Sequence, residues 1–167
     1  MGDGKKLLVD ILTVLESYRA DHERCAAHVE SLCNLMTKLS YYKPDSSEVA
    51  VDFRLQQEIE DEYFEKRERL AKVCSQTEVG LRKLLGYLTI ARSEADVSIP
   101  ISLESLEQMY ASMVQQKMVE DQTIRALDMM MDTREINTDA FITSVAVFKY
   151  SPYFNQGSLS TLIDSFK

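Results

Sequence analysis

Glycine and proline are scarce in this chain of 167 residues, with five and three copies respectively. These two residue types supply most tight turns and most breaks in secondary structure. A chain with so few of them has room for only a few turns, which favours a small number of long helices over many short strands. Tryptophan is absent, whereas methionine occurs eight times, and this unbranched side chain suits an adaptable helical core.

Positively charged residues are also fewer than negatively charged ones, and this imbalance disfavours some classes of binding partner. Lys and Arg number 19 against 27 Asp and Glu, so the formal net charge is -8. Residues 1–96 carry 14 basic and 18 acidic residues, and residues 97–167 carry 5 and 9, so each part has a net charge of -4. Nucleic-acid phosphates and anionic lipid headgroups both attract clustered Lys and Arg. We therefore expect no nucleic-acid partner and consider a membrane partner unfavoured.

The three cysteines, Cys25, Cys33 and Cys74, are odd in number, and Cys25 and Cys33 are too far apart to bridge within one helix. We interpret them as free thiols, which are typical of a reducing compartment. The beginning of the chain predicts neither a signal peptide nor a membrane span, because its apolar stretch is short and Asp10 interrupts it. The expected location is cytoplasmic, with cytoskeletal association or the nucleus as alternatives.

The strongest pattern is a seam of mostly apolar residues over positions 5–42. Its members follow one another at spacings of three and four for more than four heptads, which is typical of a helix packed along another helix. They are Leu8, Ile11, Leu15, Tyr18, His22, Cys25, Val29, Leu32, Met36 and Leu39.

Two further long helices are predicted after this one. Residues 48–95 continue the three-and-four spacing, with one extra residue at Thr77–Leu81, so we expect a bend or a close helix crossing near Gly80 and Gly86. Pro44 separates the first two helices, and one of the residues 45–47 is expected to cap the second. Ser102 is expected to cap a third helix that runs to residue 132. Lys117 and Glu120 interrupt the apolar face of that helix.

The chain after residue 132 is harder to interpret. Residues 141–148 combine helical spacing with strand propensity, and we favour a short helix because a lone strand would have no partner. Residues 137–139 are expected to cap this helix, and Ser158 is expected to cap a last amphipathic helix. The prediction is an all-α fold, an elongated antiparallel hairpin or bundle with coiled-coil-like packing. Residues 1–132 form its three long helices, and residues 133–167 form a short helical tail that packs on the bundle or on a partner.

Two clusters could carry chemistry, and both have a simpler explanation. The first cluster contains four side chains of types that bind metal ions, namely His22, Cys25, His28 and Cys33. The zinc-protease pattern, however, needs a second histidine at position 26, which is alanine. We interpret His22 as a polar seam residue that sets helix register, Cys25 as a core residue and His28 as a surface residue. The acidic residues at positions 58–68 alternate with lysine and arginine, which is typical of a solvated helix face. We expect no metal, no cofactor, no small-molecule substrate and no catalytic residue, Cys74 included.

The second predicted helix is longer than its neighbours, and we expect its overhang to leave apolar side chains exposed for a partner. We predict a non-enzymatic interaction subunit or adaptor of a larger intracellular assembly, of the cytoskeletal, tethering or kinetochore kind. The expected partners are other helical or coiled-coil subunits or a second copy of the chain. A membrane-surface-binding dimer of curved three-helix type is the alternative. The predicted partner-binding residues are Leu81, Leu84, Leu88, Leu162, Ile163 and Phe166.

Overall fold

The computed structural model describes residues 2–41, 49–94 and 98–167, and five helices make up most of this part of the chain. The helices are α1 (Gly2–Ser40), α2 (Val49–Ser93), α3 (Leu103–Thr133), α4 (Asp139–Tyr150) and α5 (Gln156–Asp164). No strand occurs in these described ranges, and residues 141–148 lie in α4. The predicted all-α helical hairpin bundle with three long helices and short C-terminal helices is confirmed.

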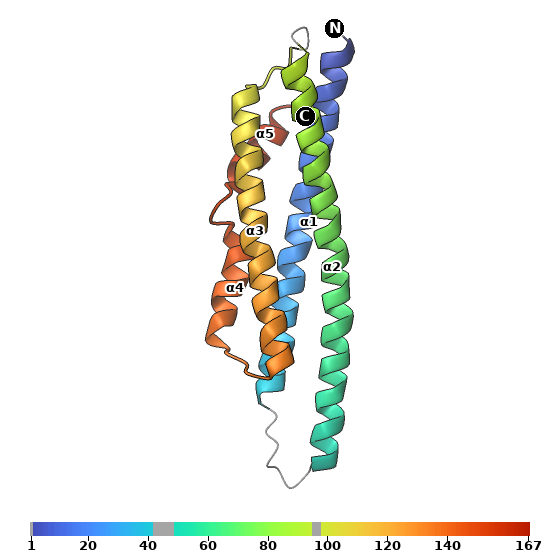
Figure 1. Ribbon diagram of the computed structural model, residues 1–167, viewed down its shortest axis with the longest axis vertical. Coiled ribbons are helices and arrows are strands. Elements are labelled where there is room, and N and C mark those ends of the chain that lie inside the picture. The colour runs from blue at the N-terminus through green and yellow to red at the C-terminus, as the bar shows by residue number, and fades with distance from the viewer. Residues whose placement is uncertain (1, 42–48, 95–97) are drawn as a thin grey trace.

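α1 is the central helix of the bundle. It runs antiparallel to α2 along most of its length, and α3 returns beside them in the direction of α1 (Figure 1). α4 and α5 lie one after the other on the side of the bundle away from α2, and α1 contacts all four other helices. The C-terminal helices therefore pack on the bundle itself. No helix in the described ranges is long and apolar enough to cross a membrane.

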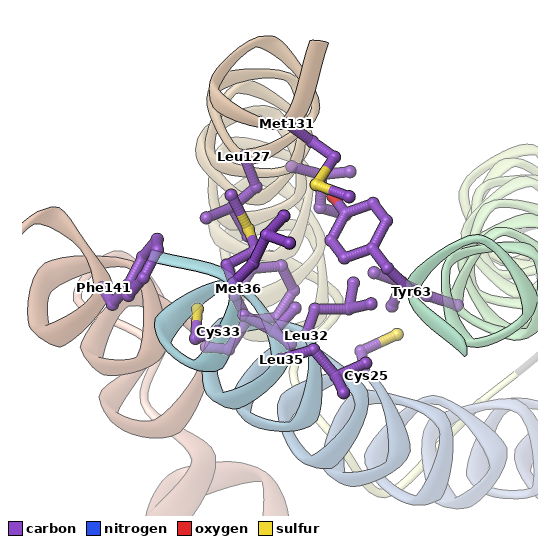
Figure 2. Close-up of a cluster of buried hydrophobic side chains, with 14 of the residues drawn as sticks. Cys25, Leu32, Cys33, Leu35, Met36, Tyr63, Leu127, Met131 and Phe141 are labelled. Atoms are coloured by element: carbon purple, nitrogen blue, oxygen red, sulfur yellow. The ribbon is translucent and has the colours of Figure 1, made fainter. Parts of the chain in front are cut away.

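The core consists of two clusters of buried side chains. The lower cluster, in the half of the bundle nearest the end of α1, brings Tyr63 of α2, Met131 of α3 and Phe141 of α4 onto Met36 of α1 (Figure 2). In the upper cluster, residues from all the helices except α4 surround the first half of α1. Its buried members are Leu7, Ile11, Val14, Leu15, Tyr18, Leu81, Leu84, Leu88, Leu106, Met113, Phe154, Leu159 and Ile163.

Side-chain caps begin α3 and α5, whereas the N-cap residue of α4, Thr138, makes no side-chain cap hydrogen bond. The Ser102 side chain accepts a hydrogen bond from the Ser105 amide at 3.3 Å, so the cap predicted for α3 is confirmed. The cap predicted at Ser158 is wrong, because α5 begins at Gln156 and the Asn155 side chain accepts from the Ser158 amide. Asparagine is among the strongest N-cap residues, which explains the earlier start. The caps expected at residues 45–47 lie outside the described residues.

The glycines of α2 are not sites of close helix approach. A Cβ atom at Gly80 or at Gly86 would meet nothing within 4 Å, so the close crossing expected there is wrong. Gly80 instead lines an open groove of about 540 Å³ between α1 and α2, together with the small residues Ser17 and Ala20. The small side chains at this point widen the space between the two helices.

Adjacent leucines on α2 allow a direct test of the packing. Leu84 is 1% exposed and Leu85 is 47% exposed. We expect Leu84→Ala to lower the free energy of unfolding by about 3 kcal/mol, because it leaves a cavity in the upper cluster. Leu85→Ala should change it by less than about 0.5 kcal/mol. Urea denaturation followed by circular dichroism measures both, and equal losses would contradict the burial of Leu84.

Candidate functional site

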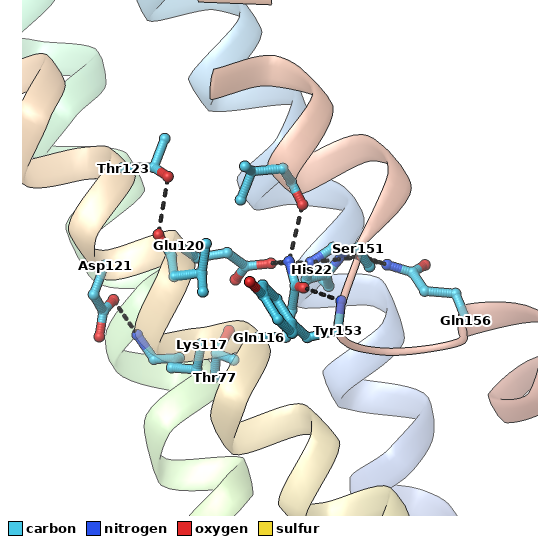
Figure 3. A network of polar contacts seen from close by, with 12 residues as sticks. His22, Thr77, Gln116, Lys117, Glu120, Asp121, Thr123, Ser151, Tyr153 and Gln156 are labelled. Carbon is cyan, nitrogen blue, oxygen red and sulfur yellow. Dashed lines mark hydrogen bonds and ion pairs between the residues drawn. The ribbon is translucent and has the colours of Figure 1, made fainter. Parts of the chain in front are cut away.

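A network of polar side chains crosses the bundle where the two core clusters meet. His22 comes from α1, and Gln116 and Glu120 come from α3; Ser151 directly follows α4, and Gln156 begins α5 (Figure 3). All except Gln156 are buried. Buried polar groups are costly unless they are hydrogen-bonded, so their partners decide what this network does.

The contacts of His22 define its tautomer. Its Nε2 atom contacts the carboxylate of Glu120, and its Nδ1 atom lies 2.6 Å from the amide nitrogen of Gln156. An amide nitrogen can only donate, so Nδ1 accepts from Gln156 and Nε2 is the atom that donates to the Glu120 carboxylate. His22 therefore donates to Glu120 and accepts from Gln156.

Gln116 connects α3 to the segment that joins α4 and α5. Its amide nitrogen donates to the Glu120 carboxylate at 2.8 Å and to the Val147 carbonyl at 2.9 Å. Its amide oxygen accepts from the Tyr153 backbone at 3.2 Å. The Gln156 amide nitrogen also donates to the Ser151 hydroxyl at 2.7 Å. These bonds attach the end of α4 and the following turn to the middle of α3.

Aromatic rings enclose the imidazole. Tyr18 stacks with His22 at a centroid distance of 6.0 Å, and Phe148 stacks with it at 6.4 Å. Phe154 meets the Tyr18 ring edge-on at 5.8 Å. Within the described ranges, the Tyr18 hydroxyl is the one buried side-chain nitrogen or oxygen without a hydrogen-bond partner. Burial, with the nearby Glu120 charge, raises the pKa of Tyr18 well above its usual range.

The geometry does not match a nucleophilic triad. In a triad, the histidine contacts the nucleophile with one ring nitrogen and the carboxylate with the other. Here the Ser151 hydroxyl, at 3.5 Å, and the Glu120 carboxylate both lie beside Nε2 of His22. In the part of the chain that the structure describes, no group of three or more His, Cys, Asp or Glu residues could hold a metal ion. The arrangement supports a positioning role, in which polar contacts define how α1, α3 and the α4–α5 turn meet.

The sequence identified one half of this network and missed the other. His22 was interpreted as a polar seam residue, and the structure places it in the core beside Glu120. In the sequence, Glu120 interrupts the apolar face of the third helix, as His22 interrupts that of the first. Two polar side chains on facing apolar helix faces can hydrogen-bond to each other, and this was the signal for the pair. Cys25 is buried as predicted, whereas His28 is half-buried rather than fully on the surface.

The predicted partner-binding residues do not form one exposed surface. Leu81, Leu84 and Leu88 are buried in the upper cluster, so the expectation that an overhang exposes them is wrong. They face α1 and the helices packed on it, which cover this end of α2. Ile163 is buried in the same cluster. Leu162 and Phe166 remain accessible and line a groove of about 760 Å³ between α5 and the start of α3.

The overhang of α2 lies at its other end. The first turns of α2 extend past the ends of α1 and α3 (Figure 1). Arg134, just after α3, forms an ion pair with Glu60 at 2.6 Å, which places the end of α3 beside that residue. Phe53 is exposed in this overhang, and Phe64 is exposed next to it, where α2 already packs on the lower cluster through Tyr63. Sequence reasoning missed the position because helix lengths alone do not tell which end of a helix is left uncovered.

Comparisons with known protein families, with curated proteins and with solved structures found no match to this chain.

A double-mutant cycle tests the buried pair. We expect Glu120→Leu or His22→Leu alone to lower the free energy of unfolding by about 3 kcal/mol, because each leaves a buried polar partner unsatisfied. The double variant should lose at least about 1 kcal/mol less than the sum of the single losses. Asp121→Asn, at a half-exposed neighbour paired with Lys117, is the matched control and should lose less than about 1 kcal/mol. Additive losses in the cycle would show that the two side chains do not interact.

His28 gives a pH-dependent prediction. Burial lowers its pKa, and the nearby charges of Arg69, Arg24 and Lys66 lower it further. The unfolded chain therefore binds this proton more readily, and stability falls as the pH drops through about 6.5 toward the pKa of the folded state. We expect His28→Gln to reduce the loss of unfolding free energy between about pH 7.5 and about pH 5.5. Urea denaturation at both pH values measures this, and an unchanged difference would contradict it.

Proposed function

We propose that this chain is a non-enzymatic helical interaction subunit or adaptor of a larger assembly, and that it binds its partner through the exposed side of the first half of α2. The observation that carries the proposal is a pair of exposed phenylalanines, one on the overhang of α2 and one on the packed part that follows it. Phe53 is 67% exposed and Phe64 is 55% exposed. Large aromatic side chains exposed on a protein surface are typical of interaction sites.

Phe53 and Phe64 lie on the same side of α2. They are eleven residues apart, which is about three helical turns. They are therefore separated by roughly 16 Å along the helix axis, a spacing that a second helix laid along α2 can match. We call this surface the Phe53–Phe64 face. Burying both rings would contribute roughly 3–6 kcal/mol to association before the entropic costs of binding.

The charge around this face indicates the chemistry of the partner. The acidic residues Asp61 and Glu68 are exposed next to it. The whole chain has a net charge of -8, so two copies repel each other at long range. We infer that the occupant is a helix of another protein, with apolar residues at helical spacing and lysine or arginine on its flanks.

The test compares three forms of the full-length protein. The double variant Phe53→Ser/Phe64→Ser removes the apolar face, and Ile142→Ser removes a 77% exposed apolar side chain on α4 as the matched control. Quantitative affinity purification from native cells identifies proteins that accompany the wild type in stoichiometric amounts. Calorimetry with the purified partner then measures the dissociation constant for each form. We expect the double variant to weaken binding at least about 30-fold, because two central aromatic contacts are lost, and the control to be unchanged.

Three outcomes would overturn the proposal. The double variant could keep full affinity for the purified partner, or the partner segment could be non-helical or acidic. Light scattering could also show a homodimer that the double variant dissociates, which would make a second copy the occupant. Binding to anionic vesicles that is lost in the double variant would instead support the membrane-surface alternative.

A further inference from the structure

Two cysteines meet across the interface between the two longest helices. Cys25 of α1 and Cys74 of α2 lie at the level where the Arg24 side chain reaches Gln76 across the two helices at 3.4 Å, and both thiols are free. Cys25 belongs to the lower core cluster, where it lies away from Phe141 (Figure 2). Cys74 packs against the same cluster and keeps part of its surface accessible. The sequence placed both in helices but did not indicate that they would be neighbours.

Only Cys74 borders an open space. It lines a groove of about 290 Å³ between α2 and α3. The charged residues of this groove are three cations and two acids, namely Arg67, Lys117, Arg125, Glu78 and Asp121. Cys25 is 3% exposed and does not line the groove. A small reagent in the groove therefore meets the thiol of Cys74 before that of Cys25.

The surroundings also divide the chemical roles of the two thiols. The hydrogen bond from Cys25 lowers the pKa of Cys74, and the charges of Lys117 and Arg67 lower it further, against the effect of burial. The same contact, together with burial, raises the pKa of Cys25. Cys74 is therefore the attacking thiol of the pair, because it borders the groove beside Lys117 and Arg67 and the thiolate is the reactive form of cysteine, and Cys25 is the second thiol.

We propose that Cys74 and Cys25 form a reversible redox site that reacts with a low-molecular-weight disulfide of the glutathione type and closes into a disulfide between α1 and α2. This site goes beyond the proposed partner binding and does not depend on it.

The reaction is two successive thiol–disulfide exchanges. The Cys74 thiolate attacks one sulfur of the small disulfide, which forms a mixed disulfide on Cys74 and releases one small thiolate. The Cys25 thiol then gives its proton to the small thiolate just released, which leaves as a thiol, and the Cys25 sulfur attacks the Cys74 sulfur. This step forms the Cys25–Cys74 bond and releases the second small thiolate. In sum, two protein thiols are oxidised and one small disulfide is reduced to two thiols.

The cross-link has a measurable consequence for stability. It closes a loop of about 50 residues that contains the α1–α2 turn, and such a loop restricts the unfolded chain. The oxidised protein should melt about 5–10 °C higher than the reduced protein, and dithiothreitol should reverse the shift.

The experiment treats the full-length protein with oxidised glutathione, quenches with acid, and maps the products by intact-mass and peptide mass spectrometry. The wild type should yield an internal Cys25–Cys74 disulfide without retained glutathione. Cys25→Ser should instead accumulate glutathione on Cys74, because the second exchange is blocked. Cys74→Ser should stay reduced at Cys25.

Cys33→Ser is the matched control. Cys33 is buried, and burial raises its pKa to about 11, so this variant should react as the wild type does and show the same upward shift in melting temperature on oxidation, relative to its own reduced form. A wild-type product without the Cys25–Cys74 linkage would overturn the proposal, as would a glutathione adduct on Cys25 in Cys74→Ser. Peptide mapping of the wild type keeps the test decisive even if one of the serine variants does not fold.

Discussion

The burial of α1 is the constraint on which the rest of the structure depends. A helix in a simple hairpin buries one stripe, but α1 contacts four helices and carries buried residues beyond its heptad-like seam, Cys33 and Leu35 among them. α2 covers one side of it, and α3, α4 and α5 share the remainder (Figure 1). Because such a surface must be removed from water, the short C-terminal helices fold back onto α1.

The buried polar network makes this packing specific. An apolar interface between helices tolerates sliding and repacking, whereas a buried donor must meet its acceptor. His22 reaches Glu120 of α3 and Gln156 at the start of α5, and Gln116 bonds to the backbone at the end of α4 and in the turn that follows it. The network therefore relates three parts of the chain that are far apart in the sequence: α1, α3 and the stretch from the end of α4 to the start of α5. The enclosing rings of Tyr18 and Phe148 keep it away from solvent, which strengthens its hydrogen bonds.

The same packing leaves α2 as the least covered long helix. It lies beside α1 and α3 only, and its first turns extend past both (Figure 1). The two features proposed as functional follow from this position. The Phe53–Phe64 face is open because no described helix reaches it, and Cys74 is accessible because α3 leaves a polar groove beside it. A covalent link between Cys74 and Cys25 would join this helix to the buried centre of the bundle.

The sequence by itself determined the helices. The three-and-four spacing, the few prolines and glycines, and the Ser102 cap were sufficient because helix formation depends on neighbours within one or two turns. Only the tertiary structure decided which helix faces meet. The sequence around Leu84 is the same whether this leucine faces a partner protein or the core of its own chain. Leu84 is buried because residues of α1, far away in the sequence, pack over it. The pairing of His22 with Glu120 and of Cys25 with Cys74 depends on helix order and register, which are properties of the whole packed chain.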